Sequence, residues 1–300
     1  MRRIINSRRR KRPPTAWVLG GGAARGAVQL GVLRALLETG SAPPTAIFGT
    51  SVGALDGAVI AARPDLEGAQ LLRELWLSKP AREVFHVHSL GALFARLAGQ
   101  LGTLSPGPLR ALIERFELAT GCTTFEDLSI PLHVVATDLI AGCSTVFRSG
   151  PLTPALMASA AIPGVFPPVT VGDRVCSDGA IVNNVPISIA VGEGYGQILA
   201  IGLMAGGELD EAPTSWAEII ARTLQLSLHE RLLGDFERLR RKARIVVICP
   251  ITSPEAAWDM RLSHVESLID RSHTAARQLL DQMGRSVFES FRRLLPGPQR

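Results

Sequence analysis

Residues 46–62 read AIFGTSVGALDGAVIAA, the most informative stretch of the chain for its architecture. The first three residues form an apolar run typical of a buried strand, and an apolar helix-like run ends the stretch. Between them, residues 49–53 match the G-x-S-x-G pattern, a strand-to-helix turn that exposes a serine hydroxyl beside backbone N–H groups. Gly49 and Gly53 suit this turn because a side chain at either position would collide as strand and helix close on it. Ser51 is therefore either a nucleophile or a structural turn serine.

Outward from this unit, strand-like and helix-like patterns alternate along the chain. Strands are expected at residues 16–19, 46–48, 132–136, 144–147, 174–177, 198–204 and 244–249. Helices are expected at residues 25–39, 52–62, 67–78, 152–160, 216–240 and 258–291, with a less regular helical pattern over 80–120. The strand–helix–strand order predicts an α/β fold with parallel strands and helical crossovers.

Length and composition indicate a globular chain. The 300 residues, 46% of them hydrophobic, suit one domain over residues 15–295, with a loose arm at 1–14 and a loose tail at 296–300. No window holds 18 uninterrupted apolar residues, so no transmembrane helix is expected. Prolines and glycines soon after the basic start argue against a signal peptide. We expect a cytoplasmic or peripherally membrane-associated protein.

The positive charge belongs to one end of the sequence. Residues 1–12 hold seven Lys/Arg and no acid, and removing these seven from the net charge of +5 leaves −2. A nucleic-acid-binding face is therefore not expected. The basic arm 2–12 is either a solvated segment or a contact for anionic lipid. The apolar segment 90–104 is either a core helix or a lid or membrane-facing flap.

Metal and disulfide patterns are not found. The four cysteines are scattered without C-x-x-C spacing, which favours reduced thiols and an intracellular chain. The six histidines show no metal-binding spacing, and the alternating pair His86 and His88 has no carboxylate or cysteine at ligand distance. No metal site and no cofactor are expected.

A glycine-rich loop, GGGAARG at residues 20–26, follows the first expected strand and allows two interpretations. It could hold a dinucleotide, but strict G-x-G-x-x-G spacing fails, and the second strand ends in Gly-Thr-Ser instead of an acid for a ribose. It could instead be an oxyanion hole, because N–H groups at a helix N-terminus carry partial positive charge. Adjacent parallel strands would place this loop beside Ser51.

A serine nucleophile needs a base. The late histidines His229, His264 and His273 all fall in charge-rich helical patterns, which favour solvated positions. Asp178 is the better candidate. It follows a short strand in Ser-Asp-Gly-Ala, where the alternative interpretation is an ordinary Asp-Gly turn.

Five segments in this order resemble the patatin-like phospholipases, which hydrolyse acyl esters with a Ser–Asp dyad and no histidine. They span about residues 16–205, and residues 206–300 match only loosely. The segments are the glycine loop with Arg25-Gly26 and Gly31-Val32-Leu33, the Ser51 turn, Ala136-Thr137-Asp138-Leu139, residues 158–169, and Asp178-Gly179-Ala180 followed by Asn184-Val185-Pro186.

The resemblance implies a three-layer α/β sandwich with a mainly parallel central sheet and helices on both faces. It assigns Ser51 as the nucleophile, Asp178 as the base, and the N–H groups of Gly21, Gly22 and Ala23 as the oxyanion hole. Ala23 stands where the family has glycine, so a positive φ there would be strained. Supporting residues are Arg25, which would brace the loop or meet a phosphate, and Gly26, Gly49, Gly53 and Gly179.

The implied activity is that of a serine acyl-ester hydrolase acting on lipids, of the phospholipase A or lipid acyl hydrolase type. Asp138 is expected to cap a turn, with a catalytic role as the alternative, and Arg148 has no assigned role. Two other classes stay open: a non-catalytic lipid-binding or scaffold protein, and a nucleotide-binding Rossmann-type oxidoreductase. The oxidoreductase would lack a Tyr-x-x-x-Lys pair, because Leu199 stands four residues after Tyr195.

Overall fold

The computed structural model describes residues 14–40, 43–85, 105–203, 212–214, 216–250 and 265–283. Several predictions therefore lie outside the described residues: the basic arm 2–12, the apolar segment 90–104, the tail 296–300, and the histidines His86, His88 and His264.

One eight-stranded mixed sheet forms the centre of the molecule. Its parallel part has the order β3-β2-β1-β7-β8, built from Leu132–Asp138, Ala46–Thr50, Thr15–Leu19, Gln197–Ile201 and Arg244–Ile248. Its antiparallel part consists of β4 (Cys143–Phe147), β5 (Val169–Val171) and β6 (Arg174–Asp178). The seven predicted strands are confirmed within a few residues. β5 was not predicted, because its three residues are too few to show a period.

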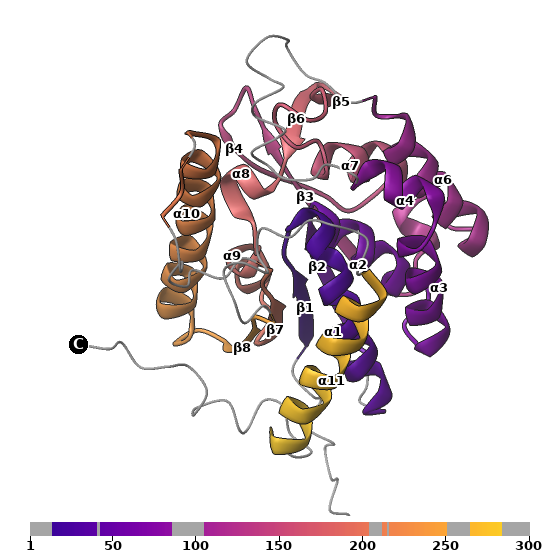
Figure 1. Ribbon diagram of the computed structural model, residues 1–300, viewed down its shortest axis with the longest axis vertical. Coiled ribbons are helices and arrows are strands. Elements are labelled where there is room, and N and C mark those ends of the chain that lie inside the picture. Colours follow the sequence, from indigo (N-terminus) through magenta and orange to yellow (C-terminus); the bar gives the residue numbers. More distant parts are fainter. Residues whose placement is uncertain are drawn as a thin grey trace, which may run out of the picture.

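Helices cover both faces of the sheet, as Figure 1 shows. One face carries α1 (Gly26–Glu38), α2 (Val52–Ala62), α3 (Leu66–Trp76), α4 (Lys79–Val84), α6 (Gly107–Thr120), α7 (Leu152–Ser159) and α11 (Val265–Met283). The other carries α9 (Ile187–Gly192) and α10 (Trp216–Leu239). The short α8 (Ala180–Asn183) follows β6. The predicted three-layer α/β sandwich is confirmed.

The two cores follow from the alternation of side chains along the strands. In β1, Trp17 and Leu19 point into the larger core beneath α1 and α2, whereas Ala16 and Val18 point into the smaller core beneath α9 and α10. Both sets are buried because helices cover both faces of the sheet, so this strand reads as a continuous apolar run.

Strands β2 and β6 meet end to end along one edge of β3. Val134 pairs with both β2 and β4, so these two strands lie on opposite edges of β3. Ala136 pairs with both β4 and β6, which places β6 on the same edge as β2. β2 runs parallel to β3 and β6 runs antiparallel, so their carboxyl ends face each other.

The last long helix, α11, packs along α1 at the carboxyl end of the described chain (Figure 1). The two helices approach so closely at Gly31 that a Cβ there would overlap Ser272. The predicted helix 258–291 is confirmed over residues 265–283, and the remainder lies outside the described residues. Within the described ranges, no helix combines the length and apolar character needed to span a membrane.

Candidate active site

Ser51 sits in a strained turn between β2 and α2. Its backbone has φ 56° and ψ −128°, a conformation that L side chains rarely adopt. A Cβ at Gly49 would lie 2.5 Å from the Cα of Ala54, and one at Gly53 would overlap the carbonyl of Leu19. Glycine is therefore required at both positions. The turn formed by residues 49–53, called the elbow below, packs directly against the end of β1.

Asp178 is the hydrogen-bond partner of the Ser51 hydroxyl. Ser51 Oγ donates to Asp178 Oδ2 at 2.6 Å, and the backbone N–H of Ala180 donates to Asp178 Oδ1 at 2.8 Å. Both side chains of the pair are almost completely buried, with exposed fractions of 4% and 3%. Burial raises the pKa of Asp178 to about 6, although both hydrogen bonds act to lower it.

The meeting of β2 and β6 produces this contact. Thr50 lies opposite Val135, and Asp178 lies opposite the next residue, Ala136. Ser51 follows Thr50 and so reaches the end of β6. A Cβ at Gly179 would overlap the carbonyl oxygen of Val135, so the chain can turn away after Asp178 only with glycine at this position.

Ser159, at the end of α7, holds the elbow from below. Its Oγ accepts the backbone N–H of Ser51 at 2.8 Å and donates to the carbonyl oxygen of Val135 at 2.6 Å. Through these two bonds, Ser159 ties the Ser51 turn to Val135 of β3. In the sequence this serine stands out only as part of the longer segment 158–169. The available signal was a serine set between the alanines Ala158 and Ala160 near the end of the mostly apolar segment 152–160.

The glycine-rich loop lies beside Ser51, as the strand order predicts. Leu19 pairs with Gly49, and a Cβ on Gly21 would lie 3.0 Å from the Cβ of Ser51. Ala23 has φ 51°, so the strain expected from a positive φ at this alanine is present. The loop continues into a 3₁₀ turn, Ala23–Arg25, and then into α1.

One predicted oxyanion donor is already occupied. The N–H of Gly21 donates to the carbonyl oxygen of Asn184 at 3.2 Å, and the Asn184 side chain lies against the same glycine. In this conformation Gly21 is therefore not available as a donor, which corrects that part of the prediction. Among the described residues, the N–H groups of Gly22 and Ala23 have no acceptor.

Arg25 braces the loop. Its side chain is 5% exposed and donates to the carbonyl oxygens of Gly22 at 3.2 Å and Leu203 at 3.1 Å. Burial lowers the pKa of its guanidinium to about 10. The guanidinium is thus turned toward the backbone just after the end of β7. These contacts are consistent with the bracing role, one of the two expected alternatives.

Two further candidates from the sequence, Asp138 and Arg148, make other contacts. Asp138 Oδ1 accepts the N–H groups of Ile140 and Ala141, both at 2.9 Å, so it caps a turn. Arg148 forms an ion pair with Glu193 at 3.3 Å. These contacts are those of structural residues.

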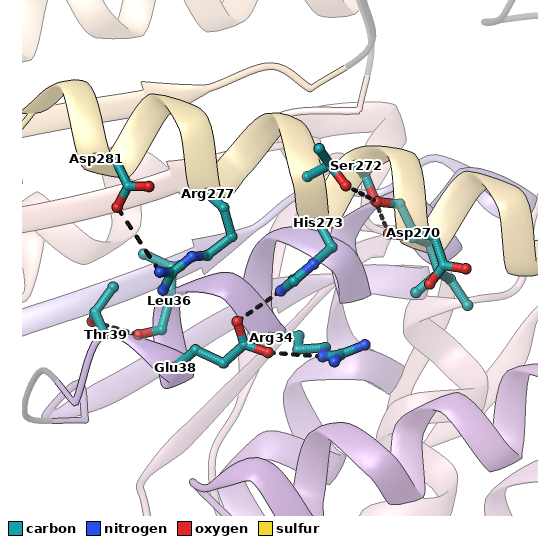
Figure 2. Close-up of polar contacts among 11 residues, drawn as sticks. Arg34, Leu36, Glu38, Thr39, Asp270, Ser272, His273, Arg277 and Asp281 are labelled. Carbon is teal, nitrogen blue, oxygen red and sulfur yellow. Dashed lines mark hydrogen bonds and ion pairs between the residues drawn. The ribbon is translucent and has the colours of Figure 1, made fainter.

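The structure describes two of the late histidines, His229 and His273. His273 lies 2.8 Å from Glu38, which also pairs with Arg34, between α11 and the end of α1 (Figure 2). His229 belongs to α10. Within the described part of the chain, no histidine hydrogen-bonds to Ser51 or Asp178, and no three His, Cys, Asp or Glu residues gather to hold a metal ion.

Comparisons with known proteins identify a family and several relatives of this chain. A family model described as patatin-like phospholipase matches residues 17–191. An uncharacterized NTE family protein of Mycobacterium tuberculosis is 34% identical over 218 residues, covering 71% of this chain and 56% of that protein. Patatin-like phospholipase domain-containing protein 7 of Rattus norvegicus is 28% identical over 247 residues, covering 80% of this chain and 17% of that protein.

Among solved structures, VipD from Legionella pneumophila aligns with a TM-score of 0.47 and 14% identity, covering 90% of this chain and 67% of that one. The chain spans about half the length of the mycobacterial relative and a smaller share of the rat protein. The matched region, residues 17–191, contains the Ser51 elbow, the glycine-rich loop and Asp178. The chain belongs to the patatin-like phospholipase family.

Proposed function

We propose that this protein is a serine hydrolase of lipid acyl esters, of the phospholipase A or lipid acyl hydrolase type, working through Ser51 and Asp178. The observation that carries the proposal is the 2.6 Å hydrogen bond between these two buried side chains. The family's description as phospholipases supports a lipid ester as the substrate. No cofactor is needed for this chemistry.

In the acylation step, Ser51 Oγ attacks the carbonyl carbon of the ester while its proton passes to Asp178 Oδ2. The carbonyl electron pair moves onto oxygen, giving a tetrahedral oxyanion. When the oxyanion collapses, the bond to the leaving alcohol breaks, and the proton on Asp178 passes to the departing oxygen. The alcohol leaves and the acyl group remains on Ser51.

In the deacylation step, the same carboxylate works in the same way on water. Asp178 takes a proton as water attacks the acyl-enzyme, and a second oxyanion forms. Its collapse breaks the bond to Ser51 Oγ, which recovers the proton from Asp178. A fatty acid is released and the starting state returns. A carboxyl group whose pKa is about 6 is ionised at neutral pH, yet basic enough to accept a proton transiently.

The N–H groups of Gly22 and Ala23 would stabilise both oxyanions. They precede α1 and lie in the loop beside Ser51, and Arg25 holds that loop through Gly22. Ser51 also stands at the N-terminus of α2, where the helix dipole favours negative charge. One correctly aimed donor of this kind is typically worth about 10²–10³ in rate.

The test is a lipid-product analysis with the full chain. Wild-type protein, Ser51→Ala and Asp178→Asn are incubated with mixed phospholipids and neutral glycerides, and released fatty acids are identified. We expect fatty-acid release from wild type only. Equal release by Ser51→Ala would refute the mechanism. Vesicle binding by wild type with no turnover would instead support the non-catalytic lipid-binding alternative.

A further inference from the structure

A second buried carboxylate, Asp56, lies on α2 one turn beyond the elbow. It is 1% exposed, and its Oδ1 accepts the indole N–H of Trp76 at 3.0 Å. Among the described residues, its Oδ2 has no hydrogen-bond partner. Burial raises the pKa of this carboxyl well above its ordinary value, and the bond from Trp76 acts in the opposite direction. A carboxyl group buried with one partner costs stability, so its single contact requires an explanation.

Trp76 is fixed from three directions. Phe85 stacks on its ring at a centroid distance of 4.8 Å and an interplanar angle of 19°, and Asp56 holds its N–H. The far edge of the indole lies against Gly26, where an added Cβ would overlap both the ring and Val52 Cγ2. Trp76 itself is 4% exposed, so it cannot move without displacing these neighbours.

These contacts join the two halves of the site. Gly26 is the first residue of α1 and directly follows the 3₁₀ turn that ends the glycine-rich loop. Val52 directly follows Ser51. The indole edge of Trp76 therefore contacts Gly26, which follows the glycine-rich loop. Gly26 in turn lies against Val52, the residue after Ser51 in the elbow.

We propose that Asp56 is a positioning residue: by holding the Trp76 ring, it sets where the oxyanion loop lies relative to Ser51. The inference rests on the proposed function of Ser51 and deepens it. Asp56 does not touch the reacting atoms. It acts through Trp76 and Gly26, so its loss should misplace the N–H groups of Gly22 and Ala23 while leaving the Ser51 and Asp178 side chains unaltered.

We expect loss of the Asp56–Trp76 contact to lower mainly kcat. An oxyanion donor matters most once the tetrahedral intermediate forms, so a shifted loop weakens transition-state binding more than ground-state binding. A misplacement of about 1 Å at a catalytic group can cost about 10²-fold in rate. Asp56→Leu and Trp76→Phe should therefore lower kcat by about 10- to 100-fold with little change in KM.

Two further variants separate positioning from general stability. Asp56→Asn keeps a carbonyl oxygen for the Trp76 N–H and should retain kcat within about threefold of wild type. Leu72 is a buried α3 side chain that lines the same apolar pocket as Asp56 and Trp76, and Leu72→Ala should cost about 2–5 kcal/mol of unfolding free energy. Because Leu72 makes no hydrogen bond to the indole, this control should keep kcat.

The experiment measures kcat and KM on a soluble p-nitrophenyl ester, together with amide hydrogen exchange over residues 20–26, for all four variants in the full chain. Asp56→Leu and Trp76→Phe should speed exchange in this segment, whereas Asp56→Asn and Leu72→Ala should not. If Asp56→Leu fails to fold, Trp76→Phe carries the test.

Wild-type exchange rates in Asp56→Leu and Trp76→Phe would overturn the inference, as would equal kcat losses in Leu72→Ala and Asp56→Leu. The exchange measurement needs no activity. If wild-type hydrolysis does not depend on Ser51, the proposed function fails while exchange still decides whether Asp56 positions the loop.

Discussion

Ser51 Oγ and Asp178 Oδ2 lie 2.6 Å apart although 127 residues separate them in the chain. The contact exists because β2 and β6 end against each other along one edge of β3, opposite the consecutive residues Val135 and Ala136. A parallel strand brings the serine to this point, and an antiparallel strand brings the carboxylate from the other side. The polarity of the two strands is thus what brings Ser51 and Asp178 into contact.

The buried carboxylate should make the protein less stable at neutral pH than a neutral side chain would. The pKa of Asp178 is raised to about 6 in the folded protein, so between about pH 4 and 6 the unfolded chain releases a proton that the folded chain keeps. Stability from this residue therefore falls as pH rises. Asp178→Asn should be more stable than wild type at pH 8, by up to about 3 kcal/mol, and equal to it near pH 4.

Urea unfolding of both proteins at several pH values checks this prediction. Because only the difference in unfolding free energy between the two proteins is used, the contributions of other titrating groups cancel. A stability difference that does not change with pH would show that Asp178 titrates at an ordinary value in the folded state.

The backbone strain at Ser51 should be measurable by comparing two variants that lack the hydroxyl group. Ser51→Ala and Ser51→Gly both lack the hydroxyl, but only glycine adopts φ 56° and ψ −128° without penalty. Ser51→Gly should therefore unfold with a free energy about 1–3 kcal/mol higher than Ser51→Ala. Denaturant unfolding gives the comparison directly. Equal stabilities would mean that the elbow relaxes when the hydroxyl is lost.

Ser159→Ala should weaken both folding and catalysis. The substitution leaves the N–H of Ser51 and the carbonyl oxygen of Val135 buried without their partner, which should cost about 1–3 kcal/mol for the unpaired groups. We also expect kcat to fall, because the elbow is held to β3 through this hydroxyl. Ser159→Thr, which keeps a hydroxyl, is the matched variant. An unchanged kcat in Ser159→Ala would show that the elbow needs no such support.

Ala23→Gly should stabilise the protein without loss of activity. Ala23 has φ 51°, and a left-handed conformation costs a non-glycine residue roughly 1–2 kcal/mol. Part of that gain is offset by the greater freedom of glycine in the unfolded chain, so we expect a net rise of about 1 kcal/mol. Thermal or denaturant unfolding measures it. A loss of stability would indicate that the Ala23 methyl group makes packing contacts that outweigh the strain.

Much of the fold could be predicted because local sequence and tertiary structure agree there. The Ser51 elbow is visible in the sequence because Gly49 and Gly53 are required by close approach, and both faces of β1 are buried, which makes it a plain apolar run. The pairing of loop and elbow followed from parallel strands alone. Asp178 was the better candidate because the late histidines fall in charge-rich helical patterns, but its assignment as the base rested on family resemblance, since an Asp-Gly pair after a strand is by default a turn.

The rest of the site depends on contacts between distant segments that have no sequence period. Ser159 supports Ser51 only because α7 ends beneath the elbow, and Gly21 donates to Asn184 only because the loop after α8 returns to β1. Trp76 reads simply as one apolar position of an amphipathic helix. Its bond to Asp56 is set by the packing of α3 against α2.

The pH dependence of kcat/KM on a soluble p-nitrophenyl ester tests the central claim most directly, because it reports the ionisation of the base in the free enzyme. With Asp178 as the base for Ser51, kcat/KM should be constant above about pH 7 and should fall tenfold per pH unit below about pH 6, since a protonated Asp178 cannot take the serine proton. Asp178→Asn should be nearly inactive throughout. Substantial activity in Asp178→Asn, or a fall that disappears when His229, His264 or His273 is replaced, would contradict the account.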